Sequence, residues 1–126
     1  MVELALKIAR RSTYKFRLGA VLAHRREVLS MGWNQMDRTH PAQLSTYDSR
    51  RNSWVPGLHA EVHACLGYEQ VPRGSVMWVA RVTRAGAPAL ARSCNLCLAF
   101  MDQIGVEKVF YTTGATGDNE LGVIEL

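Results

Sequence analysis

The sequence predicts a three-layer α/β/α sandwich around a mixed sheet of four or five strands. Short apolar runs bounded by turn residues alternate along the chain with segments whose apolar residues recur at helical spacing. The 126 residues suit a single domain, residues 1–126, and the 48% of apolar residues is typical of globular proteins. No internal repeat or low-complexity tract suggests a division of this domain.

The first half of the chain is expected to form a helix, a hairpin and a long loop. At the start of residues 1–16, apolar residues recur at the spacing of a helix, which predicts an amphipathic helix there. The inner face of this helix would carry Leu4, Ala5, Ile8 and the aliphatic stem of Arg11. Residues 17–25 and 27–34 are apolar-rich and closely spaced, which predicts the two strands of a hairpin. Residues 35–57 are polar without a clear period, so we expect a loop, and loops of this length are usually functional.

The second half is expected to alternate helices and strands. In chain order we expect a helix over 58–70, a strand over 75–82, a turn-rich connection over 83–92, a helix over 93–106, a strand over 108–114 and a short strand in the final LGVIEL. Ser93 is of a type that favours a helix N-cap, and Gly105 is of a type that ends a helix. Helices would therefore cover both faces of the sheet.

Positive charge is concentrated in the first half of the chain. Residues 1–60 contain ten Lys or Arg and four acidic residues, which gives a net charge of +6. Residues 61–126 contain five Lys or Arg and seven acidic residues, which gives a net charge of −2. The basic half suits a phosphate-bearing partner, although a solvated face rich in arginine has the same composition. The sequence shows no apolar run long enough to span a membrane and no signal-peptide pattern, so the expected location is the cytoplasm.

Two short stretches carry side chains that bind metals or transfer protons. LHAEVHAC places His59 and Glu61 at the expected start of one helix, and SCNLC places Cys94 and Cys97 at the start of another. The three cysteines are an odd number, so a closed disulfide framework is not expected. One histidine and two cysteines can hold Zn²⁺ and leave a fourth position for water, and a neighbouring carboxylate can take a proton from that water.

A closed structural zinc site is the main alternative. His63 lies one helical turn after His59, and Cys65 follows two residues later, so either could supply a fourth ligand. A closed site would leave no position for water and no role for Glu61. We therefore expect His63 to lie beside the site or at the surface, and Cys65 to be a small core residue.

The motifs resemble those of the cytidine and deoxycytidylate deaminase superfamily. LGAVLAH, SMGWN, HAEVHA, CNLC and GVEKVFYTTG occur in the order of that family and span residues 17–114. A histidine, a glutamate two residues later and a distant Cys-x-x-Cys form the signature of its zinc deaminases. The resemblance implies an α/β/α enzyme, commonly a homo-oligomer, that replaces the amino group of cytosine with oxygen by hydrolysis.

The resemblance also implies a role for several residues. The implied zinc ligands are His59, Cys94 and Cys97, and the implied proton carrier is Glu61. Asn34 would bind the sugar of the substrate. The further substrate contacts that we expect are Ala60, Arg17 and His40.

One residue departs from the family pattern. The family generally has proline before the first cysteine, where this chain has Ser93. Proline would fix the backbone that enters the helix, and serine can cap the same helix, so we expect the zinc site to survive the change.

Three functions are compatible with these motifs. The favoured function is deamination of a free cytosine nucleotide or nucleoside, dCMP above all, with the basic first half and the loop over 35–57 holding the phosphate. The alternatives are a deaminase acting on cytosine or adenine within single-stranded DNA or RNA, and a non-catalytic module stabilised by zinc. Candidate aromatic and basic contacts for these substrates are Phe16, Trp33, Tyr47, Trp54, Arg17, Arg50 and Arg51.

Overall fold

The structure, a computed structural model, describes residues 1–35, 47–48, 53–54 and 57–126. The helices are α1 (Val2–Ala9), α3 (Ala60–Cys65) and α4 (Asn95–Ile104), with a 3-10 turn at Gly117–Asn119. The strands are β1 (Arg17–His24), β2 (Glu27–Trp33), β5 (Ser75–Val82), β6 (Pro88–Ala89), β7 (Lys108–Thr112) and β8 (Leu121–Glu125). A separate pair consists of β3 (Tyr47–Asp48) and β4 (Ser53–Trp54).

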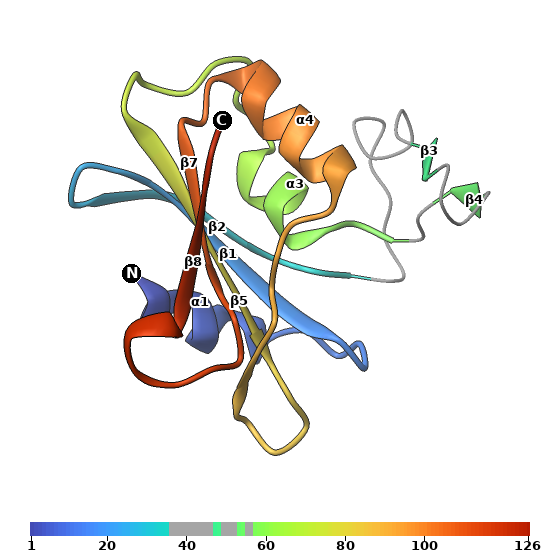
Figure 1. The fold of residues 1–126 in the computed structure, drawn as a ribbon. Helices are drawn as coiled ribbons and strands as arrows, with labels where there is room; N and C mark the ends of the chain where they lie inside the picture. Colours follow the sequence, from blue (N-terminus) through green and yellow to red (C-terminus); the bar gives the residue numbers. More distant parts are fainter. Residues whose placement is uncertain (36–46, 49–52, 55–56) are drawn as a thin grey trace.

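The main sheet is mixed and lies between two layers of helices. Its strand order is β2-β1-β5-β7-β8, with β6 paired to β5. Strands β5 and β7 run parallel, and the other pairings of this sheet are antiparallel. Helix α1 covers one face, and α3 and α4 cover the other (Figure 1). The predicted three-layer α/β/α sandwich is therefore confirmed, with the short β6 as an additional strand.

Glycines let a helix approach the sheet closely on each face. A Cβ atom at Gly19 in β1 would collide with the backbone of Ala5 and Ala9 in α1. A Cβ atom at Gly32 in β2 would lie 2.6 Å from the carbonyl oxygen of Ala60 in α3. Since real Cβ atoms do not approach backbone this closely, both positions require glycine. These two contacts fix the height of α1 and α3 above the sheet.

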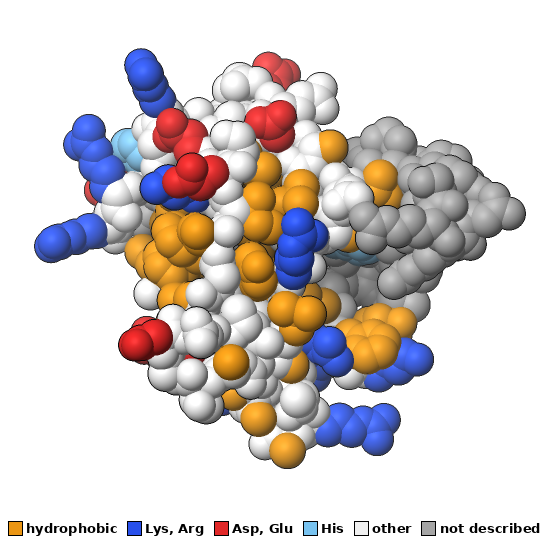
Figure 2. Space-filling model, in the orientation of Figure 1, with side chains coloured by type: hydrophobic (Ala, Val, Ile, Leu, Met, Phe, Trp, Pro, Cys, Tyr) orange, Lys and Arg blue, Asp and Glu red, His pale blue; other side chains and the backbone are white. Residues whose placement is uncertain are grey.

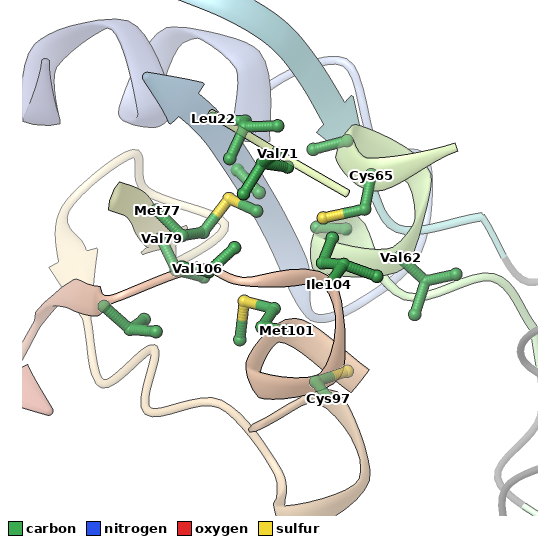
Figure 3. Packing of buried hydrophobic residues seen from close by; sticks show 14 of the residues in the cluster. Leu22, Val62, Cys65, Val71, Met77, Val79, Cys97, Met101, Ile104 and Val106 are labelled. Atoms are coloured by element: carbon green, nitrogen blue, oxygen red, sulfur yellow. The ribbon is translucent and has the colours of Figure 1, made fainter. Parts of the chain in front are cut away.

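The larger core cluster lies between the sheet and the α3 and α4 layer. Figure 3 shows Val62 and Cys65 from α3 facing the same cluster as Met101 and Ile104 from α4. Strand residues with no exposed surface, including Met77, complete this core. A smaller cluster of Ala5, Val21 and Ala80 joins α1 to the opposite face. Helices α3 and α4 are thus held by the same core.

Several element boundaries differ from the sequence prediction. The helix expected over 58–70 is only Ala60–Cys65, because Leu58 forms a bridge with Gln35 and the backbone leaves the helix at Leu66. The expected first helix ends at Ala9, so Arg11 lies beyond it and is exposed. Within the described ranges, no helix has the length and apolar character needed to cross a bilayer.

Candidate active site

The start of α3 is held against the end of β2 by backbone hydrogen bonds. The N–H of Gln35 donates to the Leu58 carbonyl at 2.8 Å, and the Leu58 N–H donates back at 2.7 Å. The next residue, His59, has an extended backbone and is the N-cap of α3. Because an N-cap residue lies outside the helical turns, its side chain can point beyond the end of the helix.

The start of α4 is built on a cysteine cap. Cys94 is the N-cap, and its Sγ accepts a hydrogen bond from the backbone N–H of Cys97 at 3.5 Å. The expectation that Ser93 caps this helix is therefore wrong, because the cysteine sulfur takes the capping position one residue later. Before the helix, the N–H of Ala91 donates to the Thr112 carbonyl at 2.8 Å and ties the incoming chain to β7.

The two helix starts bring three possible metal ligands together. The Nδ1 atom of His59 lies 3.2 Å from the Sγ of Cys97 and 3.7 Å from the Sγ of Cys94. The three ligand atoms lie within 4.8 Å of one another, and among the described residues this is the group that could hold a metal ion. One imidazole and two sulfurs suit Zn²⁺, and a set of three leaves a coordination position open. The arrangement therefore fits a catalytic zinc site.

The two sulfurs of this cluster differ in their affinity for protons. A hydrogen bond from the Cys97 side chain lowers the pKa of Cys94 to about 4, and a hydrogen bond with His59 acts in the same direction. The pKa of Cys97 is raised well above its ordinary value by that bond to Cys94 and by burial. Because thiolates are the form that binds metals, the lowered pKa of Cys94 favours its role as a metal ligand at neutral pH.

Glu61 lies in the first turn of α3 and is 4% exposed. Burial raises the pKa of its carboxyl, whereas His59 and the hydroxyl of Ser93 act against this rise. A carboxyl whose pKa is raised by burial exchanges protons more readily near neutral pH than an exposed one. Its place two residues after His59 is the place expected of a proton carrier.

His63 and Cys65 lie outside the metal-ligating group, as expected. The Nδ1 atom of His63 accepts a hydrogen bond from the Trp33 backbone N–H at 3.1 Å and lies 3.2 Å from Nε2 of Gln35. The rings of His63 and Trp33 also pack edge to face, with their centres 4.8 Å apart. Cys65 is 1% exposed within the core, and burial raises its pKa to about 12. The alternative of a closed site therefore lacks its fourth ligand among the described residues.

Asn34 joins the ends of two strands near the site. Its Oδ1 accepts a hydrogen bond from the Leu18 N–H at 2.9 Å, and its Nδ2 donates to the Phe16 carbonyl. These bonds fix the end of β2 to the start of β1. One amide hydrogen stays uncommitted by them, so contact with a sugar stays a prediction.

For the other predicted substrate contacts, the structure gives no side-chain position at the metal-ligating group. The Ala60 side chain is buried in the core, so a substrate could meet only its backbone. Alternation along β1 puts Arg17 on the face of the sheet opposite Leu18, which packs toward α3 and α4. His40, Arg50, Arg51 and the side chains of Tyr47 and Trp54 lie outside the described residues. All of these contacts stay predictions.

At the start of β1, the candidate aromatic residue Phe16 is joined by Lys15 and Arg81, two cations that were not identified from the sequence. Phe16 is 44% exposed, with the guanidinium of Arg81 4.7 Å and the ammonium of Lys15 5.2 Å from the centre of its ring. Figure 2 shows Lys and Arg side chains beside hydrophobic ones at the lower right of this face. Arg81 pairs with Leu18 across the sheet and so shares its face with α3 and α4. A signal was present, because Arg81 interrupts the apolar run SVMWVARV.

Comparisons with known proteins agree with this geometry. The family model for the cytidine and deoxycytidylate deaminase zinc-binding region matches residues 1–113. A search of curated proteins returned no match. Among solved structures, the apo dCMP deaminase of the cyanophage S-TIM5 superposes with a TM-score of 0.60 at 20% identity, covering 89% of this chain and 79% of the phage chain.

A second structure of the phage enzyme, in complex with dCMP and dUMP, gives a TM-score of 0.55 at 22% identity and covers 89% of this chain and 75% of the other. At such identities the likeness shows the fold, while the family model carries the family assignment. The chain therefore belongs to the zinc-dependent cytidine and deoxycytidylate deaminase family, and His59, Cys94 and Cys97 form a group positioned to hold the zinc ion.

Proposed function

We propose that this protein hydrolyses the amino group of a free cytosine nucleotide, with dCMP as the favoured substrate, to give the uracil form and ammonia. The observation that carries the proposal is the placement of His59, Cys94 and Cys97 within 4.8 Å of one another beside the buried Glu61. We also propose a cytoplasmic homo-oligomer, as the sequence and the family resemblance suggest.

Three residues of the chain would hold the metal. His59 would bind through a ring nitrogen, and Cys94 and Cys97 through their sulfurs, which lie 3.7 and 3.2 Å from Nδ1 of His59. Bound zinc supplies Lewis acidity, which lowers the pKa of a coordinated water to about 7. The three residues leave that position open and fix it at the meeting point of two helix starts.

Glu61 would carry the protons of the reaction. Its carboxylate takes a proton from the attacking water and passes it to the ring nitrogen next to the amino-bearing carbon. It then returns a proton to the amino group, which leaves as ammonia while the carbon keeps the oxygen of the water. Because Glu61 is buried, its proton exchange is directed to the substrate and not to bulk solvent.

The charge around Phe16 supports an anionic substrate. Arg81 and Lys15 lie over this ring, and Arg81 shares the sheet face on which α3 starts. Asn34, which binds the backbone of Phe16 and Leu18, lies between this cluster and the bridge that leads to His59. A nucleotide with its base at Glu61 and its phosphate at Arg81 would use both groups, and the phage relative is a dCMP deaminase.

The same cluster favours a second candidate function. An exposed aromatic ring flanked by cations is a feature with which proteins bind single-stranded nucleic acids. Phe16 with Lys15 and Arg81 has this arrangement. Deamination of a base within single-stranded DNA or RNA is therefore the alternative.

Ammonia release from a panel of substrates tests the proposal. The panel contains cytidine, dCMP, dCTP, guanine, adenosine and a single-stranded oligonucleotide. We expect the highest kcat/KM with dCMP and a shallow dependence on salt, because one phosphate releases few counterions. Turnover of the oligonucleotide alone, with a steep salt dependence, would replace dCMP by a nucleic acid.

A further inference from the structure

The end of β2 forms hydrogen bonds on both of its edges. Strand β2 is an outer strand of the main sheet, and the N–H of Asn34 donates inward to the Leu18 carbonyl of β1 at 3.3 Å. Because successive N–H groups of a strand point to opposite sides, those of Trp33 and Gln35 point outward, away from β1. The acceptors for these outward N–H groups come from α3 and from the residues just before it.

His63 accepts the first of these outward bonds. The Trp33 N–H donates to Nδ1 of His63 at 3.1 Å, and Nε2 of Gln35 lies 3.2 Å from the same Nδ1. Since a backbone N–H can only donate, Nδ1 is the acceptor, and the neutral ring carries its proton on Nε2. A Cβ atom at Gly32 would lie 2.9 Å from the carbonyl carbon of His63, so the glycine lets this part of α3 approach β2. One ring thus holds the residues on both sides of Asn34.

The same end of β2 is joined to the chain before and after His59. The N–H of Gln35 donates to the carbonyl of Leu58, the residue before His59, at 2.8 Å. His63 lies one helical turn after His59, and its N–H donates to the His59 carbonyl at 2.9 Å. The position of Asn34 relative to the metal-ligating group therefore depends on Leu58 and on His63.

We propose that His63 is a positioning residue for substrate binding, because its ring fixes Asn34 in place relative to the metal-ligating group. This inference rests on the proposed function and on the contact with the sugar predicted for Asn34. A hydrogen bond weakens steeply when its geometry is lost, so a strand end that shifts on α3 would bind the sugar less well. His63 acts through Asn34 and touches neither the metal nor the reacting carbon.

A matched pair of substitutions tests this role. His63→Leu has no acceptor, whereas His63→Asn places an amide oxygen close to the position of Nδ1 and can accept the Trp33 N–H. We expect His63→Leu to raise KM about 10-fold for dCMP and for cytidine, since both carry a sugar, with kcat and zinc content unchanged. His63→Asn should restore most of the lost affinity. A variant that is merely less stable would keep the wild-type KM below its Tm.

His24→Leu is the control for the loss of a histidine hydrogen bond. Nε2 of His24 lies 3.0 Å from the Arg73 carbonyl oxygen, at the last residue of β1, whereas Asn34 bonds to Leu18 near the start of that strand. His24→Leu should therefore leave KM and kcat at their wild-type values.

A double-mutant cycle tests whether His63 acts through Asn34. We expect His63→Leu to raise KM about 10-fold when Asn34 is present and to change KM little in the Asn34→Ala background, because the group that it positions is already absent. Independent effects that multiply in the double variant would give His63 a role apart from Asn34.

Hydrogen exchange tests the contact without relying on turnover. In the zinc-loaded protein, the Trp33 amide, followed by NMR spectroscopy, should exchange slowly in wild type, His63→Asn and His24→Leu. It should exchange faster in His63→Leu, in which the acceptor is absent.

Four results would overturn the inference. They are an unchanged KM in His63→Leu, an unchanged KM in Asn34→Ala, effects that multiply in the cycle, or exchange of the Trp33 amide that does not respond to His63→Leu. If the wild-type protein turns over no substrate of the panel, the proposed function fails, and hydrogen exchange still decides whether His63 holds the end of β2. If His63→Leu does not fold, His63→Ala, which also lacks the acceptor, takes its place.

Discussion

The Nδ1 atom of His59 lies 3.2 Å from the Sγ of Cys97, although 38 residues separate the two in the chain. One residue caps α3, and the other lies in the first turn of α4. Their proximity therefore depends on the packing of both helices on the same face of the sheet. Changes that move either helix, or that alter the groups around these atoms, should be visible in metal binding and catalysis.

Glu61→Gln should remove catalysis and leave the metal site intact. The amide has nearly the shape of the carboxylate but cannot accept a proton, so we expect kcat to fall by at least about 100-fold. Zinc content, measured by atomic absorption, should stay at the wild-type level. Glu69→Gln is the control, because Glu69 is exposed beyond α3. Substantial turnover by Glu61→Gln would remove Glu61 from the mechanism.

The metal-free protein should show a stability cost from Glu61 that depends on pH. Because burial raises the folded-state pKa above the ordinary value of 4.5, the folded state binds more protons than the unfolded state once the pH exceeds that value. Stability should therefore fall as pH rises from 4.5 through the raised pKa. Relative to wild type, metal-free Glu61→Gln should gain stability over that range and show no gain below it, as measured by urea unfolding at several pH values.

The cysteines of the metal-free protein should differ in their reaction with iodoacetamide. Cys94, with a pKa of about 4, is a thiolate at pH 7, whereas Cys65, with a pKa of about 12, is a buried thiol. Peptide mapping by mass spectrometry should find Cys94 labelled first and Cys65 labelled only after unfolding. Zinc should protect Cys94, and labelling that zinc does not slow would contradict its role as a ligand.

Gly32→Ala should separate α3 from the sheet. The added methyl group would meet the backbone of Ala60 and Ala64, which cannot move away as a flexible side chain would. We expect a loss of about 1 to 3 kcal/mol in the free energy of unfolding, together with weaker zinc binding. Met31→Ala in the same strand is the control, since Met31 is 39% exposed. Wild-type zinc affinity in a destabilised Gly32→Ala would show that the site tolerates movement of α3.

Arg81→Ala should distinguish a nucleotide from a nucleoside. If Arg81 binds the phosphate, the substitution removes a charge-assisted hydrogen bond and lowers kcat/KM for dCMP by about 10-fold or more. The value for cytidine, which has no phosphate, should change little. Arg84→Ala controls for the loss of one positive charge, because Arg84 is exposed in the turn after β5. Equal losses for dCMP and cytidine would place Arg81 outside the phosphate site.

Local sequence patterns predicted most strands and the two helix starts that carry the metal ligands, and the zinc deaminase signature predicted that these starts come together. Leu58 and His59 follow a Pro-Gly break, and Cys94 and Cys97 have the spacing of one helical turn, so nearby residues set the place of each ligand at the start of its own helix. The hairpin of β1 and β2 and the strand β5 were predicted for the same reason, since their apolar runs end at turn residues. Short-range signals suffice where the neighbouring residues determine the backbone.

Other features were not predicted, two of them because they depend on contacts between distant segments. The bridge between Gln35 and Leu58 delays the start of α3 to Ala60, two residues after the predicted start. The place of Arg81 beside Phe16 depends on the register between β1 and β5, and register cannot be derived from one strand alone. The capping of α4 by Cys94 was missed because serine is the more common capping type.

Strand β6 returns the chain to the sheet before α4 begins. Its pairing with the end of β5, the bridge between Leu90 and Thr113, and the bond from Ala91 to Thr112 all anchor the chain upstream of Cys94. The turn over 83–87 lies on the far side of these anchors from the cysteine. Because these anchors lie between the turn and Cys94, an affinity tag or fluorophore inserted into the turn should leave the position of the cysteine ligands unchanged. The turn is therefore a suitable attachment point for single-molecule work.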